Sequence, residues 1–376
     1  MIPLRLPAVI EAGTTEPFIA VVANEDGCPV HDLGSSGSAE LFLRHAAPLE
    51  RSADSTVTLK SHFGRVRLSG VSPADLLGDV LLIDPPGATA HRLIRARSPH
   101  NTLLVTERCD QLCVMCSQPP KKTHVDLFDH FVVACKLAPA NMTIGISGGE
   151  PTLYKDQLFD LIEDVFEARP DVRFHVLTNG QHFARDDARR LGQRALREVL
   201  WGIPLYAAEP GRHDAIVKKA GAFERLLEGF VPLMLSGAAI ELRTVVLKDN
   251  AELLPELARL VAAQLPFIRF WAIMQLENAG FARRAWPSLF FDTSLNFAPI
   301  AGAIDVALSR GIGVSLYNFP LCTVPDAYRS LCASSISDWK RRYLSACACC
   351  SLKNDCGGFF EWYPECAGFA GIRPVP

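Results

Sequence analysis

The chain has 376 residues, of which 49% are hydrophobic and 21% charged, so two or three folded domains with a sizeable core are expected. Its net charge of −3 argues against a protein that binds nucleic acid through gross electrostatics. No apolar stretch reaches the roughly 18–20 residues of a membrane span, and the N-terminus lacks the pattern of a signal peptide. These properties predict a cytoplasmic protein without a membrane partner.

Short apolar runs separated by Gly, Pro, Ser and Asp characterise the first hundred residues. The runs are EPFIAVVAN (16–24), STVTLKSHFGRVRLSG (55–70) and DVLLIDPPG (79–87). Such runs are typical of strands joined by tight turns. We therefore predict a small β-rich N-terminal domain over residues 1–98, which serves as a docking surface or as a stabilising cap.

From about residue 101 the sequence alternates between strand-like runs and amphipathic helical patterns. The strand-like runs are TLLV (102–105), MTIGIS (142–147), RFHVLT (173–178), EVLWGIPLY (198–206), IELRTVVL (240–247) and FIRFWAIM (267–274). They are apolar or β-branched on both faces, as buried parallel strands are. Six βα units predict an α/β fold, a partial (β/α)6 TIM-like barrel over residues 99–300, with its chemistry on the loops that follow the strands.

Cysteines are unusually frequent for a reducing cytoplasm, where structural disulfides are not expected. Nine of the 12 lie in two groups, one within residues 109–116 and one within residues 322–356. Cys28, Cys135 and Cys366 lie outside them. Clustered thiols of this kind predict metal or iron–sulfur ligation.

The first group, Cys109, Cys113 and Cys116, has the spacing C-x3-C-x2-C and follows the first predicted strand. A closed zinc site needs four ligands, so His124 would have to complete one. The alternative is a [4Fe–4S] cluster that is held by three thiolates and keeps one iron open. The spacing alone leaves both readings open.

This motif, followed by the GGEP turn (148–151) after the second strand, resembles the radical S-adenosylmethionine (SAM) superfamily. The resemblance implies that the open iron chelates the amino and carboxylate groups of SAM. It also implies that reductive cleavage of SAM gives a 5′-deoxyadenosyl radical, which abstracts hydrogen from the substrate.

The resemblance implies roles for residues around the first two loops. Gly148 and Gly149 would let the backbone approach the methionine end of SAM closely. Glu150 would accept a hydrogen bond from the SAM ammonium group, and Pro151 would stiffen the turn. Met115, before the third cysteine, would lie against the adenine.

Candidate SAM contacts also lie on the later strands. Thr178 and Asn179 end the third strand and would touch the methionine carboxylate or the ribose. Arg243 on the fifth strand would bind the carboxylate, unless it forms an ordinary ion pair. Met274 and Gln275, at the end of the sixth strand, are weaker candidates for adenine contact.

The second group resembles the auxiliary-cluster domain of many radical SAM enzymes, in its SPASM/twitch-like form. Cys347, Cys350 and Cys356 read C-x2-C-x5-C-G-G, and Cys322 supplies the upstream ligand. The resemblance implies a second, fully ligated [4Fe–4S] cluster in a C-terminal domain of residues 315–376. A four-cysteine zinc site is the alternative, and Cys349 or Cys366 could replace an assigned ligand.

The segment TERCDQLCVMCSQPPKKTH (106–124) resembles the C component of the His-Xaa-Ser system, a radical SAM maturase. This likeness implies a ribosomally made precursor peptide as substrate and a second radical SAM maturase as heteromeric partner. It also implies an electron donor such as a flavodoxin or ferredoxin.

Two other functions fit the same motifs. One is a radical SAM enzyme that acts on a nucleotide, tRNA or small molecule, and the other is a non-catalytic cluster-bearing subunit. No acid–base residue can be assigned, although His175, His182, His213 and Asp214 are candidates. The atom attacked and the bond formed are not predicted.

Overall fold

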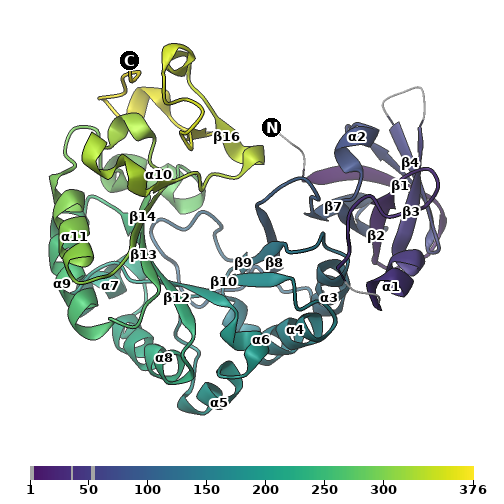
Figure 1. The fold of residues 1–376 in the computed structure, drawn as a ribbon, viewed down its shortest axis with the longest axis horizontal. Coiled ribbons are helices and arrows are strands. Elements are labelled where there is room, and N and C mark those ends of the chain that lie inside the picture. Colours follow the sequence, from purple (N-terminus) through teal and green to yellow (C-terminus); the bar gives the residue numbers. More distant parts are fainter. Residues whose placement is uncertain (1–3, 35–36, 52–55) are drawn as a thin grey trace.

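The computed structural model describes residues 4–34, 37–51 and 56–376. Its N-terminal part is a closed antiparallel-rich barrel with the strand order β1-β5-β4-β3-β2-β6-β7 (Figure 1). The strands are β1 (Arg5–Gly13), β2 (Phe18–Ala23), β3 (Ala46–Arg51), β4 (Thr56–Ser61), β5 (Gly64–Ser69), β6 (Val80–Asp84) and β7 (Thr89–Ile94). Helices α1 (Gly37–His45) and α2 (Pro73–Leu76) accompany them. The prediction of a β-rich N-terminal segment is confirmed, whereas its role stays a proposal.

A second sheet contains eight strands in the order β15-β14-β13-β12-β11-β10-β9-β8, and every neighbouring pair is parallel. The strands are β8 (Asn101–Thr106), β9 (Thr143–Gly148), β10 (Arg173–Leu177), β11 (Leu200–Pro204), β12 (Ala239–Val246), β13 (Phe270–Gln275), β14 (Val314–Tyr317) and β15 (Cys332–Ala333). The six predicted strands are all present. The predicted number is wrong, because two short strands extend the sheet beyond residue 300.

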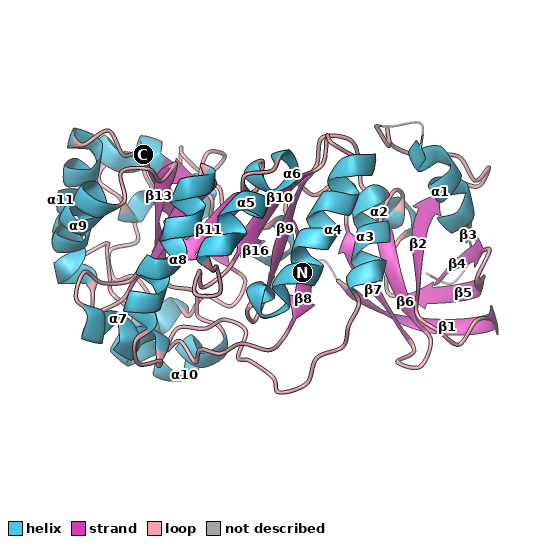
Figure 2. Ribbon diagram, turned by 90° about the horizontal axis from the view of Figure 1, so that it is seen from below, coloured by secondary structure: helices cyan, strands magenta, loops and turns pink. Residues whose placement is uncertain are grey.

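Helices cover the outer side of this sheet, which follows a curve in Figure 1 and is seen from below in Figure 2. The helices of this part of the chain are α3 (Phe128–Lys136), α4 (Lys155–Ala168), α5 (Ala188–Leu191), α6 (Arg194–Arg197), α7 (Pro210–Val217), α8 (Ala222–Ser236), α9 (Leu254–Gln264), α10 (Gly280–Leu289) and α11 (Ala298–Ser309). Of these, α7 and α10 contact the loop after β8, and α10 also packs against the C-terminal segment. Strands β8 and β15 are the two ends of the sheet, which does not close. The partial barrel itself stays a prediction.

Successive side chains along each strand point to opposite faces of the sheet, so the two faces differ chemically. One face packs under the helices in the main core, with Trp201 of β11 and Leu242 of β12 fully buried there. We call the opposite face the inner face. It carries the alternate residues of the same strands, among them His175, Gly202 and Glu241.

The C-terminal part has little regular structure beyond the short hairpin of β16 (Arg341–Arg342) and β17 (Phe359–Phe360). Arg95, just after β7, donates two hydrogen bonds of 2.9 Å to the Asp338 carboxylate. Ser98 donates a third, of 3.1 Å, to the same group. The segment that leads into β8 is therefore tied to the C-terminal part of the chain. Across the described residues, the helices are too short or too polar to traverse a lipid bilayer.

Candidate functional site

The loop that carries the first cysteine group follows β8 and is fixed by backbone hydrogen bonds to distant elements. Leu112 N and Val114 N donate to carbonyls at the end of α7, at 3.2 and 2.9 Å. Phe281 N, in the first turn of α10, donates to Cys116 O at 2.9 Å. The three cysteines are thus presented on an ordered loop.

The GGEP turn packs directly against the start of this loop. Gly149 N donates to Thr106 O, and Glu150 N donates to Arg108 O, both at 2.8 Å. A Cβ on residue 149 would lie 2.0 Å from the Arg108 carbonyl oxygen, and Gly148 adopts a φ of +138°. Two glycines are needed because the backbones touch here and one residue is left-handed.

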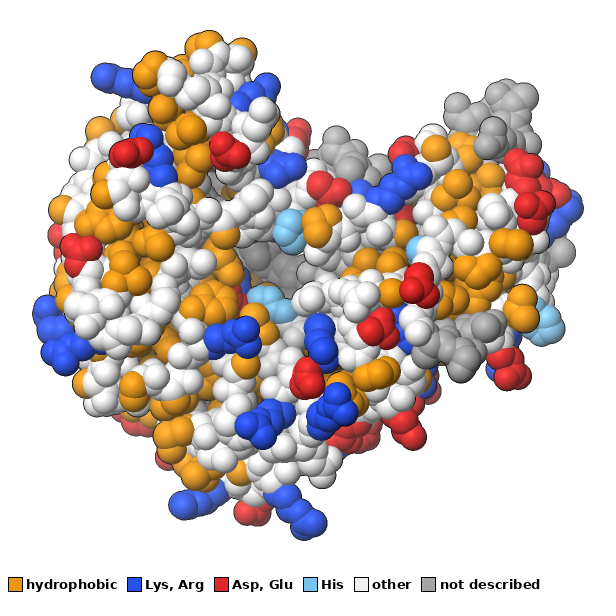
Figure 3. Space-filling model, in the orientation of Figure 1, with side chains coloured by type: hydrophobic (Ala, Val, Ile, Leu, Met, Phe, Trp, Pro, Cys, Tyr) orange, Lys and Arg blue, Asp and Glu red, His pale blue; other side chains and the backbone are white. Residues whose placement is uncertain are grey.

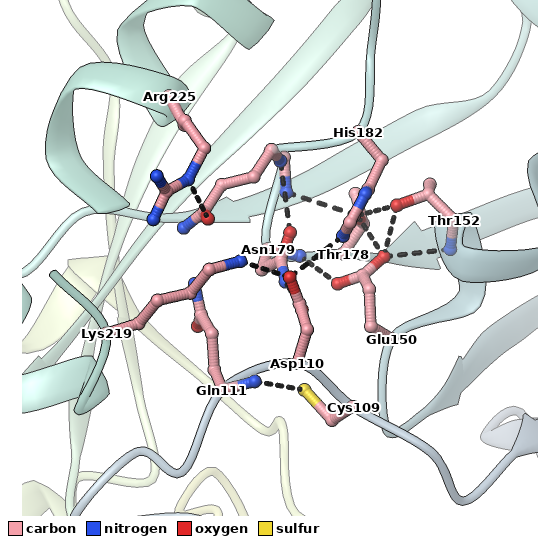
Figure 4. Close-up of polar contacts among 12 residues, drawn as sticks. Cys109, Asp110, Gln111, Glu150, Thr152, Thr178, Asn179, His182, Lys219 and Arg225 are labelled. Atoms are coloured by element: carbon pink, nitrogen blue, oxygen red, sulfur yellow. Dashed lines mark hydrogen bonds and ion pairs between the residues drawn. The ribbon is translucent and has the colours of Figure 1, made fainter. Parts of the chain in front are cut away.

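Glu150 organises the turn from inside the protein (Figure 4). Its carboxylate is 1% exposed and accepts hydrogen bonds from Thr152 N, Thr152 Oγ1 and Thr178 Oγ1 on Oε1, and from Asn179 N on Oε2. Burial raises the pKa of Glu150, while these hydrogen bonds act in the opposite direction. Thr178 and Asn179 therefore bond to Glu150. Their predicted contacts with SAM, and that of Glu150, stay predictions.

Asp110, inside the cysteine motif, holds a second part of the network in Figure 4. Its carboxylate pairs with Lys219, accepts from Asn179 Nδ2 at 2.8 Å and lies 3.2 Å from His182 Nε2. Burial would raise the pKa of Asp110, but His182 and Lys219 outweigh it and hold that pKa below its usual range. Asp110 was not predicted as a site residue, although its position between the predicted ligands Cys109 and Cys113 could have indicated such a role.

The remaining predicted SAM contacts lie near the same end of the sheet. Met115 is 8% exposed and packs in an apolar cluster with Ile216 and Leu276. Arg243 donates from Nη1 to Glu241 Oε2 at 2.8 Å, which is the ion pair considered as its alternative role. Met274 is half-buried on β13, where the strand alternation places it on the inner face.

The three thiols of the first loop are chemically suited to a cationic group. Burial, followed by the charges of Cys116 and Cys109, raises the pKa of Cys113 to about 12. Burial likewise raises the pKa of Cys109 to about 11. Without a positive group nearby these thiols stay protonated, whereas ligation to a metal requires the thiolate form. A metal cluster with three thiolate ligands would supply that charge.

The described side chains do not by themselves outline a metal site. Among the described residues, no three or more His, Cys, Asp or Glu side chains are arranged to hold one. His124 stacks on Tyr154 with 4.0 Å between ring centroids, and neither of its ring nitrogens has a hydrogen-bond partner. A Zn²⁺ site requires sulfurs about 2.3 Å from one ion, whereas a cluster spreads its thiolates over separate irons. The same holds for both cysteine groups, so the zinc and the cluster assignments both stay predictions.

The second cysteine group surrounds a pocket of about 370 Å³, part of which is open to solvent. Its lining includes the four predicted ligands, Cys322, Cys347, Cys350 and Cys356. Backbone N–H groups of Leu321 and Gly358 lie 3.4 Å from Cys356 Sγ, and Val375 N lies 3.4 Å from Cys350 Sγ. Such N–H···S contacts are common around cluster thiolates, whose potential they tune.

The other C-terminal cysteines do not line this pocket. Cys349 and Cys366 are exposed, and Cys332 lies in β15. The four predicted ligands therefore share one pocket, and their assignment to a second cluster stays a prediction. Cys349 and Cys366 do not take a place in it in this arrangement.

The four acid–base candidates serve different structural purposes. His175 bonds to Glu241, and His182 lies beside Asp110. Asp214 accepts from the backbone N–H groups of Gly221 and Phe223 and so fixes the start of α8. His213 is 1% exposed and stacks on Tyr206.

The free energy of unfolding should depend on pH through His213, because burial lowers the pKa of this histidine from 6.5 to about 4. Between those values the unfolded chain binds a proton that the folded chain lacks, so stability falls as the pH falls. From pH 7.5 to 5.5 the wild type should lose about 1 kcal/mol more than His213→Asn. Urea unfolding at both pH values measures this difference, and equal losses would contradict it.

Figure 3 shows that the molecule is hollowed on one face, between the part that carries β16 and the N-terminal barrel. Histidine side chains lie on the rim of this hollow. In the matching view of Figure 1 the hollow lies within the curve of the second sheet. The inner face of that sheet is therefore reachable from solvent.

No family model and no curated protein matches the chain. Similar solved structures include SuiB of Streptococcus suis bound to SAM, with 14% identity over 59% of this chain and 51% of that chain, at a TM-score of 0.49. A radical SAM methyltransferase from Sphaerobacter thermophilus is 14% identical over 74% of this chain and 80% of that chain, with a TM-score of 0.44. The structure of anSMEcpe bound to AdoMet and a peptide is 15% identical over 57% of this chain and 62% of that chain, with a TM-score of 0.41.

The chain spans about half the length of SuiB. The structures that it resembles bind SAM or are radical SAM enzymes. With TM-scores below 0.5, these likenesses do not establish a shared fold or activity, so function is inferred from the residues of this chain.

Proposed function

We propose that this protein is a radical SAM enzyme that modifies a ribosomally made precursor peptide. The observation that carries the proposal is the contact between the cysteine loop and the GGEP turn. Three half-buried thiols stand beside a turn whose glycines let it pack directly against the cysteine loop, next to polar groups that follow β10. A cluster with one open iron and a SAM molecule together suit this arrangement better than a closed metal site.

When bound, the cluster supplies the electron that cleaves SAM reductively into methionine and a 5′-deoxyadenosyl radical. The chain's own residues would hold the cluster and orient SAM. Cys109, Cys113 and Cys116 would ligate three irons, while Glu150 keeps the turn rigid through Thr152 and Asn179. The ion pair of Asp110 and Lys219 ties the cysteine loop to the segment after α7.

A second [4Fe–4S] cluster in the C-terminal pocket is part of the proposal. Its support is the four-cysteine lining of that pocket and the N–H groups that approach two of the sulfurs. With four protein ligands this cluster would have no open iron. It would conduct electrons or brace the site rather than bind SAM.

The substrate class rests on the likeness of residues 106–124 to the C component of the His-Xaa-Ser system. We infer a peptide with His-Xaa-Ser repeats, a second radical SAM maturase as partner and a flavodoxin or ferredoxin as electron donor. The N-terminal barrel is assigned to docking of the peptide or of the partner.

The test is anaerobic purification, iron analysis and incubation with SAM, a reductant and a His-Xaa-Ser peptide, with and without the partner maturase. About eight irons per chain and a mass shift of the peptide are expected. Zinc in place of iron would contradict the radical SAM assignment. SAM cleavage without any mass shift of the peptide would indicate that the substrate is a nucleotide, a tRNA or a small molecule instead.

Two neighbouring cysteines give a matched pair for the second cluster in the same assay. Cys350→Ser should lower the iron content by about four per chain, because it removes a ligand from the pocket. Cys349→Ser should leave the iron content unchanged, since Cys349 is exposed and outside the lining. Equal iron contents in the two variants would count against the assigned ligands.

A further inference from the structure

Three segments that meet at the cysteine loop form a strongly basic surface, which we call the loop face. They are the loop itself (106–124), the end of α7 with the residues after it (216–219), and the first two turns of α10 (280–287). Together they hold seven lysines and arginines but only two acids, in a chain whose net charge is −3. A concentration of charge against the sign of the whole molecule indicates a negatively charged partner.

Backbone hydrogen bonds hold the three segments together. Leu112 N donates to Val217 O at 3.2 Å, and Phe281 N donates to Cys116 O at 2.9 Å. A Cβ on Gly280 would lie 2.2 Å from the same Cys116 oxygen, so α10 begins directly against the loop. In Figure 2, α7 and α10 lie along the lower side of the molecule, where the loop reaches both. The basic residues of the three segments therefore belong to one surface.

Four of the positive charges on the loop face are free to meet a partner. The two acids are already paired, Glu107 with Lys121 at 2.7 Å and Asp110 with Lys219. Four further cations are exposed, namely Lys122, Lys218, Arg283 and Arg284. Among the residues that the structure describes, no acidic side chain forms an ion pair with any of these four.

An exposed apolar residue lies next to one of the predicted cluster ligands on the loop face. Leu112 is 55% exposed and directly precedes Cys113. The aromatic side chains of the three segments are half-buried or buried, so none is exposed for stacking on bases; they are His124, Phe281 and Trp286. A small apolar contact within a basic rim suits a transient complex with an acidic protein better than a nucleic acid.

We propose that the loop face docks the acidic electron carrier, a protein of the ferredoxin or flavodoxin class, that reduces the first cluster. This inference rests on the proposed function and deepens it, because it assigns the donor to a surface. One electron leaves the carrier, which is oxidised, and enters the cluster, which is reduced. A carrier that contacts Leu112 is one residue away from Cys113, a predicted ligand of that cluster.

The test measures binding of fluorescein-labelled, oxidised ferredoxin and flavodoxin, both acidic, to the anaerobic, cluster-loaded protein by fluorescence anisotropy. At about 50 mM salt the double variant Arg283→Glu/Arg284→Glu should bind at least one carrier about 10- to 30-fold more weakly than the wild type, because two attractive charges become repulsive. At about 1 M salt the two proteins should agree within about twofold, since the Debye length falls to about 3 Å.

Arg259→Glu/Arg310→Glu is the matched control, because it changes the net charge equally at exposed positions outside the loop face. It should bind both carriers within about twofold of the wild type. A second readout separates docking from cluster assembly. With a pre-reduced carrier, 5′-deoxyadenosine formation should fall about 10-fold in the loop-face variant, whereas with dithionite, which needs no docking surface, it should stay within about twofold of the wild type.

The outcomes of this test distinguish the docking surface from the proposed function. Unchanged carrier binding in Arg283→Glu/Arg284→Glu, an equal loss in the control, or no binding of either carrier to the wild type would overturn this inference. So would tighter binding of a tRNA than of both carriers, if the same variant weakens it. SAM cleavage with dithionite would leave the proposed function standing in each of these cases, and its absence would remove that function whatever the carriers bind.

Discussion

Cys116→Ala is expected to remove the first cluster and with it the reductive cleavage of SAM. Iron should fall from about eight to about four per chain, and 5′-deoxyadenosine formation should fall by more than about a thousandfold. The physical reason is that Cys116 is one of only three thiols on the loop, so no spare ligand can replace it. Iron assay and chromatography of the SAM products measure both quantities.

The control for this variant is Cys28→Ala, which removes an exposed cysteine outside both groups and should change neither quantity. The same pair distinguishes a catalytic protein from a cluster-bearing partner subunit. If Cys116→Ala leaves peptide modification intact while the partner maturase remains essential, this chain is the non-catalytic subunit.

Gly149→Ala is expected to separate the GGEP turn from the cysteine loop. The added Cβ would lie 2.0 Å from the oxygen and 2.4 Å from the carbon of the Arg108 carbonyl, both of which are backbone atoms. Because neither backbone can move alone, the free energy of unfolding should fall by about 3 kcal/mol. Affinity for SAM should fall by about 100-fold as its binding groups are displaced.

Gly313→Ala is the matched control, because its Cβ would meet only Phe270 Cβ at an ordinary 3.7 Å. It should keep wild-type stability within about 0.5 kcal/mol and bind SAM normally. Urea unfolding and equilibrium dialysis with labelled SAM measure the two effects. Wild-type SAM affinity in Gly149→Ala would refute the assigned role of this turn.

Periodicity and motif spacing were enough to predict much of this structure. The strands β8 to β13 could be located because each is a long apolar run between polar turns. Strands β14 and β15 were missed because they have only four and two residues. Strands β1 and β3 were missed because each contains a proline, Pro7 or Pro48, which argues against a strand.

The parts of the candidate site that lie within one short sequence motif could be predicted, and the contacts between distant segments could not. Cys109, Cys113 and Cys116 lie within one motif, and the second group could be assembled from its spacing. The distant partners of Glu150 and Asp110 could not be predicted, because they come from the loop after β10 and from the segment after α7. The loop face could not be predicted either, because its basic residues come from three segments that are far apart in the sequence.

The hydrogen bonds between Arg95 and Asp338 join residues that are 243 positions apart. Arg95 lies before β8, whose far end leads to Cys109, while Asp338 lies between Cys322 and the other three cysteines of the C-terminal pocket. The first strand of the sheet is thereby clamped to the segment that follows its last strand. The segment that leads into the first cysteine group and the segment within the second group therefore share one fixed contact.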